Sequence, residues 1–272
     1  MPPMHIDIQA TLRERLPGKS RLIPRFAVRW LERYVCQERL NEILDAIGDN
    51  EGVEAAAISL WELGITVEAK GLEQLPTEGR YVFASNHPLG GLDGLALIKL
   101  LGERYDGEVR FLVNDLLMAV KPLEPIFLPI NKYGKQSRQA AIAIERELRS
   151  DRQILTFPAG LCSRRQSGKV ADLPWQKSVV AMAVRAKRDI VPIFFDEENS
   201  RAFYRNANWR KRLGIKFNAE MLMLPREMVK KQGSTLHLVV GQPVAWDTLD
   251  AAHPVEEAVR LRQLVYSLKE TL

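Results

Sequence analysis

From residue 64 onward, short apolar runs that favour β-strands alternate with segments whose apolar residues recur at helical spacing. The strand-like runs are residues 65–71, 80–85, 109–113, 154–157, 189–195 and 236–244, and the helical patterns are 95–101, 138–150, 177–187 and a segment from about 254. This alternation predicts an α/β fold with a mainly parallel sheet flanked by helices. Sites in such sheets lie beyond the carboxyl ends of the strands.

The first 63 residues follow a different pattern and predict an N-terminal helical extension, with the main domain at residues 64–272. Residues 22–48 have helical spacing, with Phe26 and Trp30 on an apolar stripe and Arg25, Arg29 and Arg33 on a basic one. Two arrangements fit this pattern. The apolar stripe either faces an anionic membrane surface or packs on the main domain.

The cysteines and the apolar runs exclude several classes of protein. Cys36 and Cys162 are the only two cysteines, far apart and without ligand spacing, which excludes a disulfide framework or a zinc cluster. The start of the chain lacks the apolar core of a signal peptide, and no run approaches the roughly 20 apolar residues that span a bilayer. We therefore expect a cytoplasmic chain whose membrane association is peripheral.

The net charge of +5 is unevenly distributed, with one basic cluster in residues 21–33 and another in residues 205–231. Basic patches of this kind bind anionic lipid or nucleic acid, and a solvated helix face is the alternative to both. Nucleic-acid binding would account for the basic clusters but for neither of the two loops described next. We therefore expect no nucleic-acid partner.

A Gly-rich loop follows the strand-like run that ends at Ser85, and it holds His87 and, six residues later, Asp93. A neutral imidazole that is hydrogen-bonded to a carboxylate keeps one tautomer and can take a proton from a hydroxyl near neutral pH. Asp93 would also suit as the cap of a helix that begins at Gly94, and the two roles are compatible. Because the sequence lacks G-x-S-x-G, it favours direct attack by an acceptor hydroxyl over a covalent acyl-enzyme.

A second loop follows the strand-like run that ends at Phe157, and it places Ser163, Arg164 and Arg165 behind the strand end. Guanidinium groups bind phosphate or carboxylate through two oxygens, so this loop predicts recognition of an anionic group. Taken alone, the two arginines would fit a solvated turn equally well.

Four segments in order, NHPLGGLDG, FLPINKYGK, FPAGLCSRR and DIVPIFF, resemble the four blocks of the glycerol-phosphate and lysophospholipid acyltransferase superfamily. The resemblance covers about residues 69–196 and is strongest to a hemolysin-like bacterial subgroup that includes O-acyltransferases of aminolipid synthesis. It implies an α/β sheet with flanking helices, no metal and no organic cofactor. The co-substrate would be acyl-CoA or an acyl carrier protein, and the enzyme would act at the inner face of the cell membrane.

The resemblance also implies a role for individual residues. His87 would be the general base and Asp93 its partner. Apart from the resemblance, we expect the loop with Asn86, Gly90 and Gly91 to lie around the oxyanion. The implied acceptor-binding residues are Phe157, Pro158, Gly160, Ser163, Arg164 and Arg165. The implied acyl pocket is lined by Val191, Pro192 and Ile193.

The chain departs from the superfamily pattern at two places. Five residues, rather than the usual four, separate His87 from Asp93, and we expect the extra residue to form a bulge in the Gly-rich loop. Ala159 replaces the glutamate of the FPEG block, and the arginine expected near Ile130 or Asn131 is missing. These losses argue against a simple glycerol-phosphate acceptor.

The sequence therefore predicts an O-acyltransferase that acylates the hydroxyl of a lysolipid, with an acceptor of the ornithine- or glycine-lipid type. Acylation of 1-acylglycerol-3-phosphate is the close alternative. A non-catalytic membrane adaptor is the alternative from another class, and the His87–Asp93 pair counts against it because a binding module needs no base.

Overall fold

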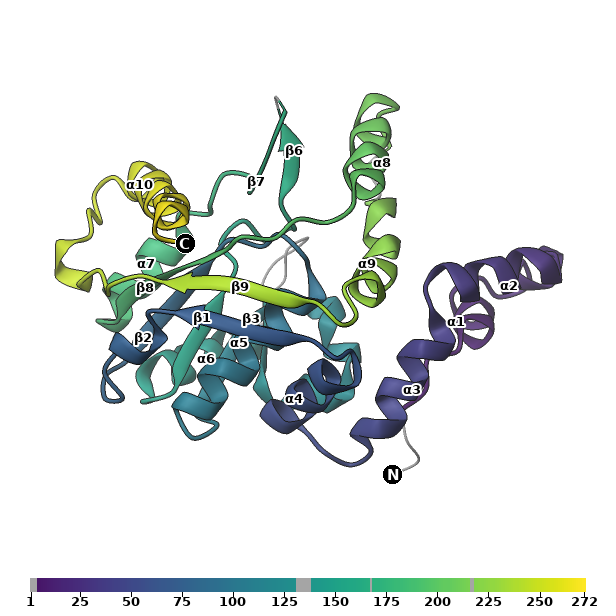
Figure 1. Cartoon of the computed structure of the whole chain (residues 1–272), viewed down its shortest axis with the longest axis horizontal. Helices are drawn as coiled ribbons and strands as arrows, with labels where there is room; N and C mark the ends of the chain where they lie inside the picture. The colour runs from purple at the N-terminus through teal and green to yellow at the C-terminus, as the bar shows by residue number, and fades with distance from the viewer. Residues whose placement is uncertain (1–3, 131–137, 167, 216–217) are drawn as a thin grey trace.

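A seven-stranded sheet forms the centre of the computed structural model, which describes residues 4–130, 138–166, 168–215 and 218–272 (Figure 1). In sheet order, the strands are β1 (Thr66–Lys70), β9 (Thr235–Val240), β8 (Asp189–Phe195), β2 (Tyr81–Ser85), β5 (Gln153–Thr156), β3 (Val109–Asn114) and β4 (Phe127–Ile130). All neighbouring strands pair in parallel except β8 and β9, which are antiparallel. The predicted mainly parallel sheet is confirmed.

Strand β2 lies between β8 and β5, and all five of its residues are buried. Phe83 pairs in register with Val191 on one side and with Leu155 on the other. Successive side chains point to opposite faces of the sheet, so Phe83 enters one hydrophobic core while Val82 and Ala84 enter the other. Such burial on both faces requires the continuous apolar run that marks this strand in the sequence.

Helices cover the two faces of the sheet, as the sequence predicts. The core that contains Phe83 is closed by α3 (Gln37–Ile47), α4 (Gly52–Glu62) and α5 (Gly91–Arg104), and the core that contains Val82 by α6 (Arg138–Arg149), α7 (Ser178–Ala186) and α10 (Pro254–Ser267). The remaining body elements are α8 (Arg201–Arg212), α9 (Leu224–Lys230) and a hairpin of β6 (Arg164–Gln166) and β7 (Lys169–Ala171).

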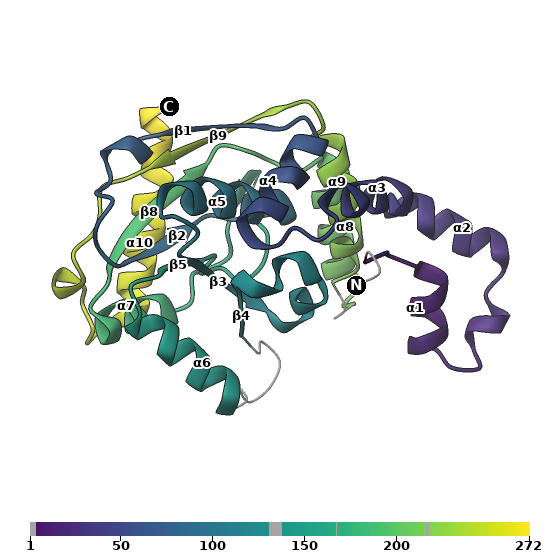
Figure 2. The same ribbon diagram turned by 90° about the horizontal axis from the view of Figure 1, so that it is seen from below.

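An arm formed by α1 (Ile8–Arg15) and α2 (Arg25–Tyr34) extends away from the sheet (Figures 1 and 2). The side-chain amide of Asn41 in α3 bonds both the N–H and the carbonyl of Ile6, and so holds the start of the arm. Where α2 approaches α9, the guanidinium of Arg226 lies 5.5 Å from the centre of the Tyr34 ring. Within the described ranges, no helix is long and apolar enough to cross a bilayer.

The predicted single helix over residues 22–48 is wrong in one respect, because the structure divides it into α2 and α3 at Cys36. Cys36 has φ 54°, a left-handed conformation that interrupts the helical hydrogen-bond pattern. The boundary between residues 63 and 64 stays a prediction. Helix α4, which precedes that boundary, packs on the sheet through Ala55, Ala56 and Leu60.

Candidate active site

The two loops that the sequence singles out meet at the carboxyl ends of neighbouring strands. His87 follows β2 and Phe157 follows β5, and these strands are paired. The two rings stack with their centres 3.9 Å apart, and the Ser163 N–H donates a hydrogen bond of 2.7 Å to the His87 carbonyl. The paired strands therefore build one site from both loops.

The His87 ring is held by a buried carboxylate. Its Nδ1 lies 2.8 Å from Asp93 Oδ2; Asp93 is fully buried, whereas 17% of the His87 side chain is exposed. The same carboxylate oxygen accepts the backbone N–H groups of Leu89 (2.9 Å) and Gly90 (3.0 Å). Three donors on one oxygen fix the carboxylate, and the carboxylate fixes the imidazole.

The extra residue between His87 and Asp93 is accommodated as the sequence predicts, since the pair forms in spite of it. Gly90 has φ +91°, where an added Cβ would also stand 3.1–3.2 Å from the Leu224 and Cys162 side chains. Helix α5 begins at Gly91 rather than near Gly94 or Leu95. Asp93 thus caps the helix from its third position by accepting the Gly90 N–H.

The surroundings of His87 change its affinity for a proton. Burial by itself lowers the pKa of the imidazole, but the Cys162 sulfur and the Asp93 carboxylate beside it outweigh burial. The pKa of His87 is therefore raised above its ordinary value of about 6.5. Both flanking groups favour the imidazolium, which is the form that a general base reaches when it has taken a proton.

Asp172 connects the two loops to the C-terminal part of the chain, a role that the sequence analysis missed. Its carboxylate accepts the His87 backbone N–H (3.1 Å), the Ser163 hydroxyl (2.6 Å) and the Trp175 indole N–H (2.9 Å). Burial raises the pKa of Asp172, although these donors oppose that effect. Asp172 follows β7, a strand of three residues, and no motif in the sequence marks it.

Tyr266 and Arg262 of α10 hold the backbone of Asp172. The Asp172 N–H donates to the Tyr266 hydroxyl at 2.7 Å, and the Arg262 guanidinium donates to the Asp172 carbonyl at 2.8 Å. A residue that supports the site is thus fixed by the closing helix of the chain.

The three residues predicted to lie around the oxyanion have different roles in the structure. The Asn86 side chain donates to the Phe195 carbonyl and accepts the Phe195 N–H, so it ties the loop to β8. The Gly90 N–H is used by Asp93 and cannot serve an oxyanion in this arrangement. Gly91 is exposed at the first position of α5, and its role toward the oxyanion stays a prediction.

The predicted acceptor loop is partly closed off. The Ser163 hydroxyl is used by Asp172, and Arg164 is buried, donating to the Cys162 carbonyl and, at 2.9 Å, to Glu220. The prediction that Arg164 binds an anionic ligand is wrong, because its guanidinium is paired with the buried Glu220 carboxylate. Arg165 points outward and is exposed.

Pro158 and Gly160 shape the turn of this loop. The Pro158 carbonyl accepts the Gln176 N–H at 3.0 Å, and the Gly160 N–H donates to the Phe157 carbonyl at 2.9 Å. Gly160 has φ +64°, a left-handed conformation that favours glycine at this position. The turn brings Cys162 and Ser163 back against His87.

The residues predicted to line the acyl pocket lie in β8, buried next to β2. Val191 pairs in register with Phe83, Pro192 with Ala84 and Ile193 with Ser85. Val191 and Ile193 belong to the core that α5 closes. Their role toward an acyl chain stays a prediction. The expected block-two arginine position Asn131 lies outside the described residues, whereas Ile130 ends β4.

A second His–Asp pair stands apart from the site. His253 Nδ1 lies 2.8 Å from Asp250 Oδ2, the same separation as in the His87–Asp93 pair, but both side chains are largely exposed. No group of three His, Cys, Asp or Glu side chains that could hold a metal ion occurs within the described ranges.

Several known proteins are similar to this chain. A family model described as Acyltransferase matches residues 10–272. A lyso-glycine lipid O-acyltransferase of Bacteroides thetaiotaomicron is 45% identical over 264 residues, which cover 97% of each chain. A lyso-glycine lipid O-acyltransferase of Phocaeicola vulgatus is also 45% identical over 264 residues, covering 97% of this chain and 95% of its own. The crystal structure of the 1-acyl-sn-glycerophosphate (LPA) acyltransferase PlsC from Thermotoga maritima aligns over 88% of this chain and 95% of its own, with a TM-score of 0.49 and 15% identity.

Proposed function

The chain belongs to the acyltransferase family that matches it almost from end to end, and from that premise we propose that it acylates a lyso-glycine lipid or a related lyso-aminolipid. The acyl group would come from a thioester and would be transferred to a hydroxyl of the acceptor. The observation that carries the acceptor class is the 45% identity, over 97% of the chain, to proteins named lyso-glycine lipid O-acyltransferases. This places the chain in lipid biosynthesis.

The reaction begins at His87. Its Nδ1 is occupied by Asp93, so Nε2 takes the proton from the acceptor hydroxyl while the hydroxyl oxygen attacks the thioester carbonyl. The imidazolium that forms is stabilised by the buried Asp93 carboxylate. When the tetrahedral intermediate collapses, the C–S bond breaks and the thiolate of the carrier receives the proton. The products are an ester and a free thiol.

The N-terminus of α5 supplies a favourable field for the oxyanion. Its N–H groups and the partial positive charge of the helix dipole lie directly beside the His87 loop, and Gly91 is the exposed first residue. An N–H at this position would donate to the negative oxygen that develops on the attacked carbonyl. Removal of one such donor lowers kcat by about 10²–10³-fold in well-studied acyl transferring enzymes.

Arg165 is the cation of the predicted acceptor loop that remains exposed, and a guanidinium pairs with one carboxylate as readily as with a phosphate. The glycine-lipid head group carries one carboxylate. Ala159 stands where the superfamily pattern has a carboxylate, and it is buried, so it offers no polar group to a glycerol phosphate. These features favour an aminolipid acceptor over 1-acylglycerol-3-phosphate.

The arm formed by α1 and α2 supports attachment to an anionic membrane surface at the inner face of the cell membrane. Leu22, Phe26 and Trp30 are 81%, 76% and 61% exposed, so this apolar stripe does not pack on the main domain. Arg25, Arg29 and Arg33 are exposed beside it. Interleaved basic and apolar side chains on a helix are typical of interfacial binding.

The test is a competition between acceptors. Purified protein receives one acyl thioester together with equal amounts of a lyso-glycine lipid and 1-acylglycerol-3-phosphate, and mass spectrometry measures the diacyl products. We expect the aminolipid product to dominate, with one equivalent of free thiol released per ester formed. Preference for the glycerol phosphate would overturn the acceptor assignment. Absence of thiol release with either acceptor would support the non-catalytic adaptor.

A further inference from the structure

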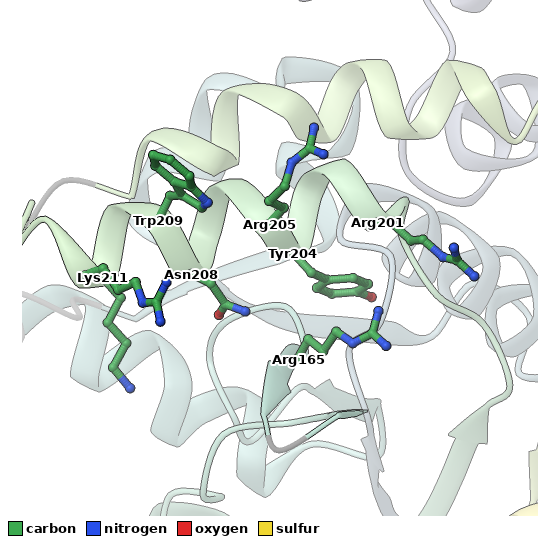
Figure 3. A pocket seen from close by; sticks show the side chains of 8 residues that line it. Arg165, Arg201, Tyr204, Arg205, Asn208, Trp209 and Lys211 are labelled. Carbon is green, nitrogen blue, oxygen red and sulfur yellow. The ribbon is translucent and has the colours of Figure 1, made fainter.

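A cleft of about 740 Å³ lies between the β6–β7 hairpin and α8, and basic side chains dominate its wall. Five cationic residues line it: Arg165 of β6, and Arg201, Arg205, Lys211 and Arg212 of α8. Figure 3 shows Arg165 extending from the hairpin toward Tyr204, with the other labelled cations placed along α8. The volume falls within the range of about 300–1,000 Å³ that is usual for small-molecule sites.

The five cations have no acidic partner in the part of the chain that the structure describes, where none of them forms an ion pair or a side-chain hydrogen bond. Arg210 of the same helix differs: it lies 2.8 Å from Glu220 Oε2, and Arg164 occupies the other oxygen of that carboxylate. The Glu220 carboxylate is thus already shared by two buried or half-buried arginines. Like charges spaced four residues apart, as in Arg201 and Arg205, destabilise a helix unless an anion is bound.

Both walls of the cleft are joined to the catalytic loop. On one wall, Tyr204 is buried and its hydroxyl accepts the Asn199 N–H, while the Asn199 amide donates to the Pro88 carbonyl, directly after His87. On the other wall, Arg165 is two residues from Ser163, whose N–H bonds the His87 carbonyl. Both elements that line the cleft are therefore joined through hydrogen bonds to the loop that holds His87.

We propose that this cleft binds the phosphorylated adenine nucleotide portion of the acyl-CoA donor, an inference that rests on the proposed acyl transfer. A 3′-phosphate and a pyrophosphate together carry about four negative charges, which match the four cations of α8 and leave Arg165 to the acceptor carboxylate. Trp209, 62% exposed on the same helix, offers a face on which an adenine ring stacks, and Asn208 adds an amide.

Other anions fit the cleft less well. The acceptor carboxylate carries one charge and needs one guanidinium, which Arg165 provides. An anionic bilayer would also reach the exposed side chains of the cleft, and the vesicle measurement in the test below distinguishes it from a nucleotide. A carrier protein presents acidic side chains and a single phosphate but no adenine ring, so it would pair with the cations without using the exposed face of Trp209. The combination of four cations with an exposed Trp therefore points to a nucleotide.

Steady-state kinetics of the Arg201→Gln/Arg205→Gln double variant test the proposal. We expect its KM for acyl-CoA to rise by roughly 10- to 100-fold, from the loss of two charge-assisted contacts, with kcat within about twofold of the wild type. With the same acyl group on pantetheine, which lacks the nucleotide and its phosphates, the variant and the wild type should give equal kcat/KM. The matched control is Arg149→Gln/Arg185→Gln, which removes two exposed arginines from α6 and α7 and should leave both values unchanged.

Direct binding supplies a readout that does not depend on catalysis. In titration calorimetry, adenosine 3′,5′-bisphosphate should bind the wild type and the control, and bind the double variant and Trp209→Ala at least about tenfold more weakly. Three outcomes would overturn the nucleotide assignment. The first is an active double variant whose KM for acyl-CoA is unchanged, and the second is an equal loss of kcat/KM with the pantetheine donor. The third is a loss seen only in binding to vesicles or in activity with acyl carrier protein as the donor. If the wild type acylates no acceptor, the proposed function is wrong. The bisphosphate titration then still shows whether the cleft binds a nucleotide.

Discussion

The loop between β2 and α5 differs from the arm formed by α1 and α2 in where its polar side chains find their partners. In the loop, the side chains of Asn86, His87 and Asp93 all form hydrogen bonds within the protein. In the arm, Arg25, Arg29 and Arg33 are exposed beside Phe26 and Trp30. A loop held in this way can position a proton to within a fraction of an ångström, whereas the arm offers a surface to something outside the molecule. Changes in the loop should therefore alter chemistry, and changes in the arm should alter where the enzyme works.

The strongest test of that division is His87→Ala. Loss of the general base should lower kcat/KM for acyl transfer by about 10²–10⁴-fold. Vesicle binding should change little, because His87 is not part of the arm. The melting temperature should fall, because the buried Asp93 carboxylate loses the imidazole that donates to it. Thiol release measured with a purified, folded variant checks this. Near-normal turnover would place the base elsewhere.

His253→Ala is the matched control for His87→Ala. It removes an imidazole that has the same Nδ1–Oδ2 separation of 2.8 Å from an aspartate, but on the surface at Asp250. We expect unchanged turnover, because exposed pairs contribute little and this one does not reach the site. A large loss here would show that a His–Asp pair as such is no guide to the site.

Asp93→Asn should produce the next largest effect, a loss of about 10–10³-fold in kcat/KM together with about 1–3 kcal/mol of stability. The carboxylate both stabilises the imidazolium and accepts the Leu89 and Gly90 N–H groups, so kinetics and thermal unfolding should change together. A variant that loses stability but keeps its turnover would reduce Asp93 to a helix cap.

The pH profile separates these two roles of Asp93. Because the pKa of His87 is raised, the base is protonated at low pH, and kcat/KM of the wild type should increase with pH through an inflection above about 6.5. Asp93→Asn removes one of the groups that raise the pKa, so the inflection should move to lower pH. The sign for stability is the opposite: the contribution of His87 is complete below about pH 6.5 and is lost as pH rises through the folded-state pKa. An inflection that does not move would contradict the coupling.

In the arm, Arg25→Gln/Arg29→Gln/Arg33→Gln should weaken binding to anionic vesicles by roughly 100-fold at low salt, since each of the three basic residues near such a surface contributes about 1 kcal/mol. High ionic strength should remove most of the difference between the variant and the wild type. Cosedimentation with anionic and with neutral vesicles checks this. Equal binding to both would refute the electrostatic part.

The smallest expected effect is that of Trp30→Ala, about a few-fold in vesicle binding, with an unchanged melting temperature. Trp30 is 61% exposed and stacks only on Tyr34, with ring centres 4.9 Å apart, so its removal leaves no cavity in the core. A marked loss of thermal stability would show that the arm folds back on the main domain in solution.

The same contrast explains what could be predicted from the sequence. Buried strands such as β2 and β8 and the helices at their sides were predictable because apolar periodicity decides which faces are covered. Strand β4 and helix α8 were not predicted. The first has four residues and includes Pro129, and the second carries so many charges that its apolar face, Phe203, Tyr204 and Ala207, is hard to recognise.

In the site, the His87–Asp93 pair followed from the Gly-rich loop that holds both residues, and the approach of the Phe157 loop followed from the rule that sites lie beyond the carboxyl ends of parallel strands. Asp172 and the capture of Arg164 by Glu220 did not follow, because both depend on contacts between segments far apart in the sequence. The spacing of residues within one segment does not predict such contacts. The position of a charged residue in a loop therefore predicts that the residue lies at the site. It does not predict whether the side chain is available to bind a ligand.

Asp172 has a consequence for the order in which the enzyme becomes competent. The ribosome delivers the His87 loop in the first third of the polypeptide, but the Asp172 backbone that supports it is held by Tyr266 and Arg262. Strand β9, which pairs with both β1 and β8, also emerges late. A nascent chain thus carries its base before the residues that position it, and acyl transfer begins only after α10 has been synthesised.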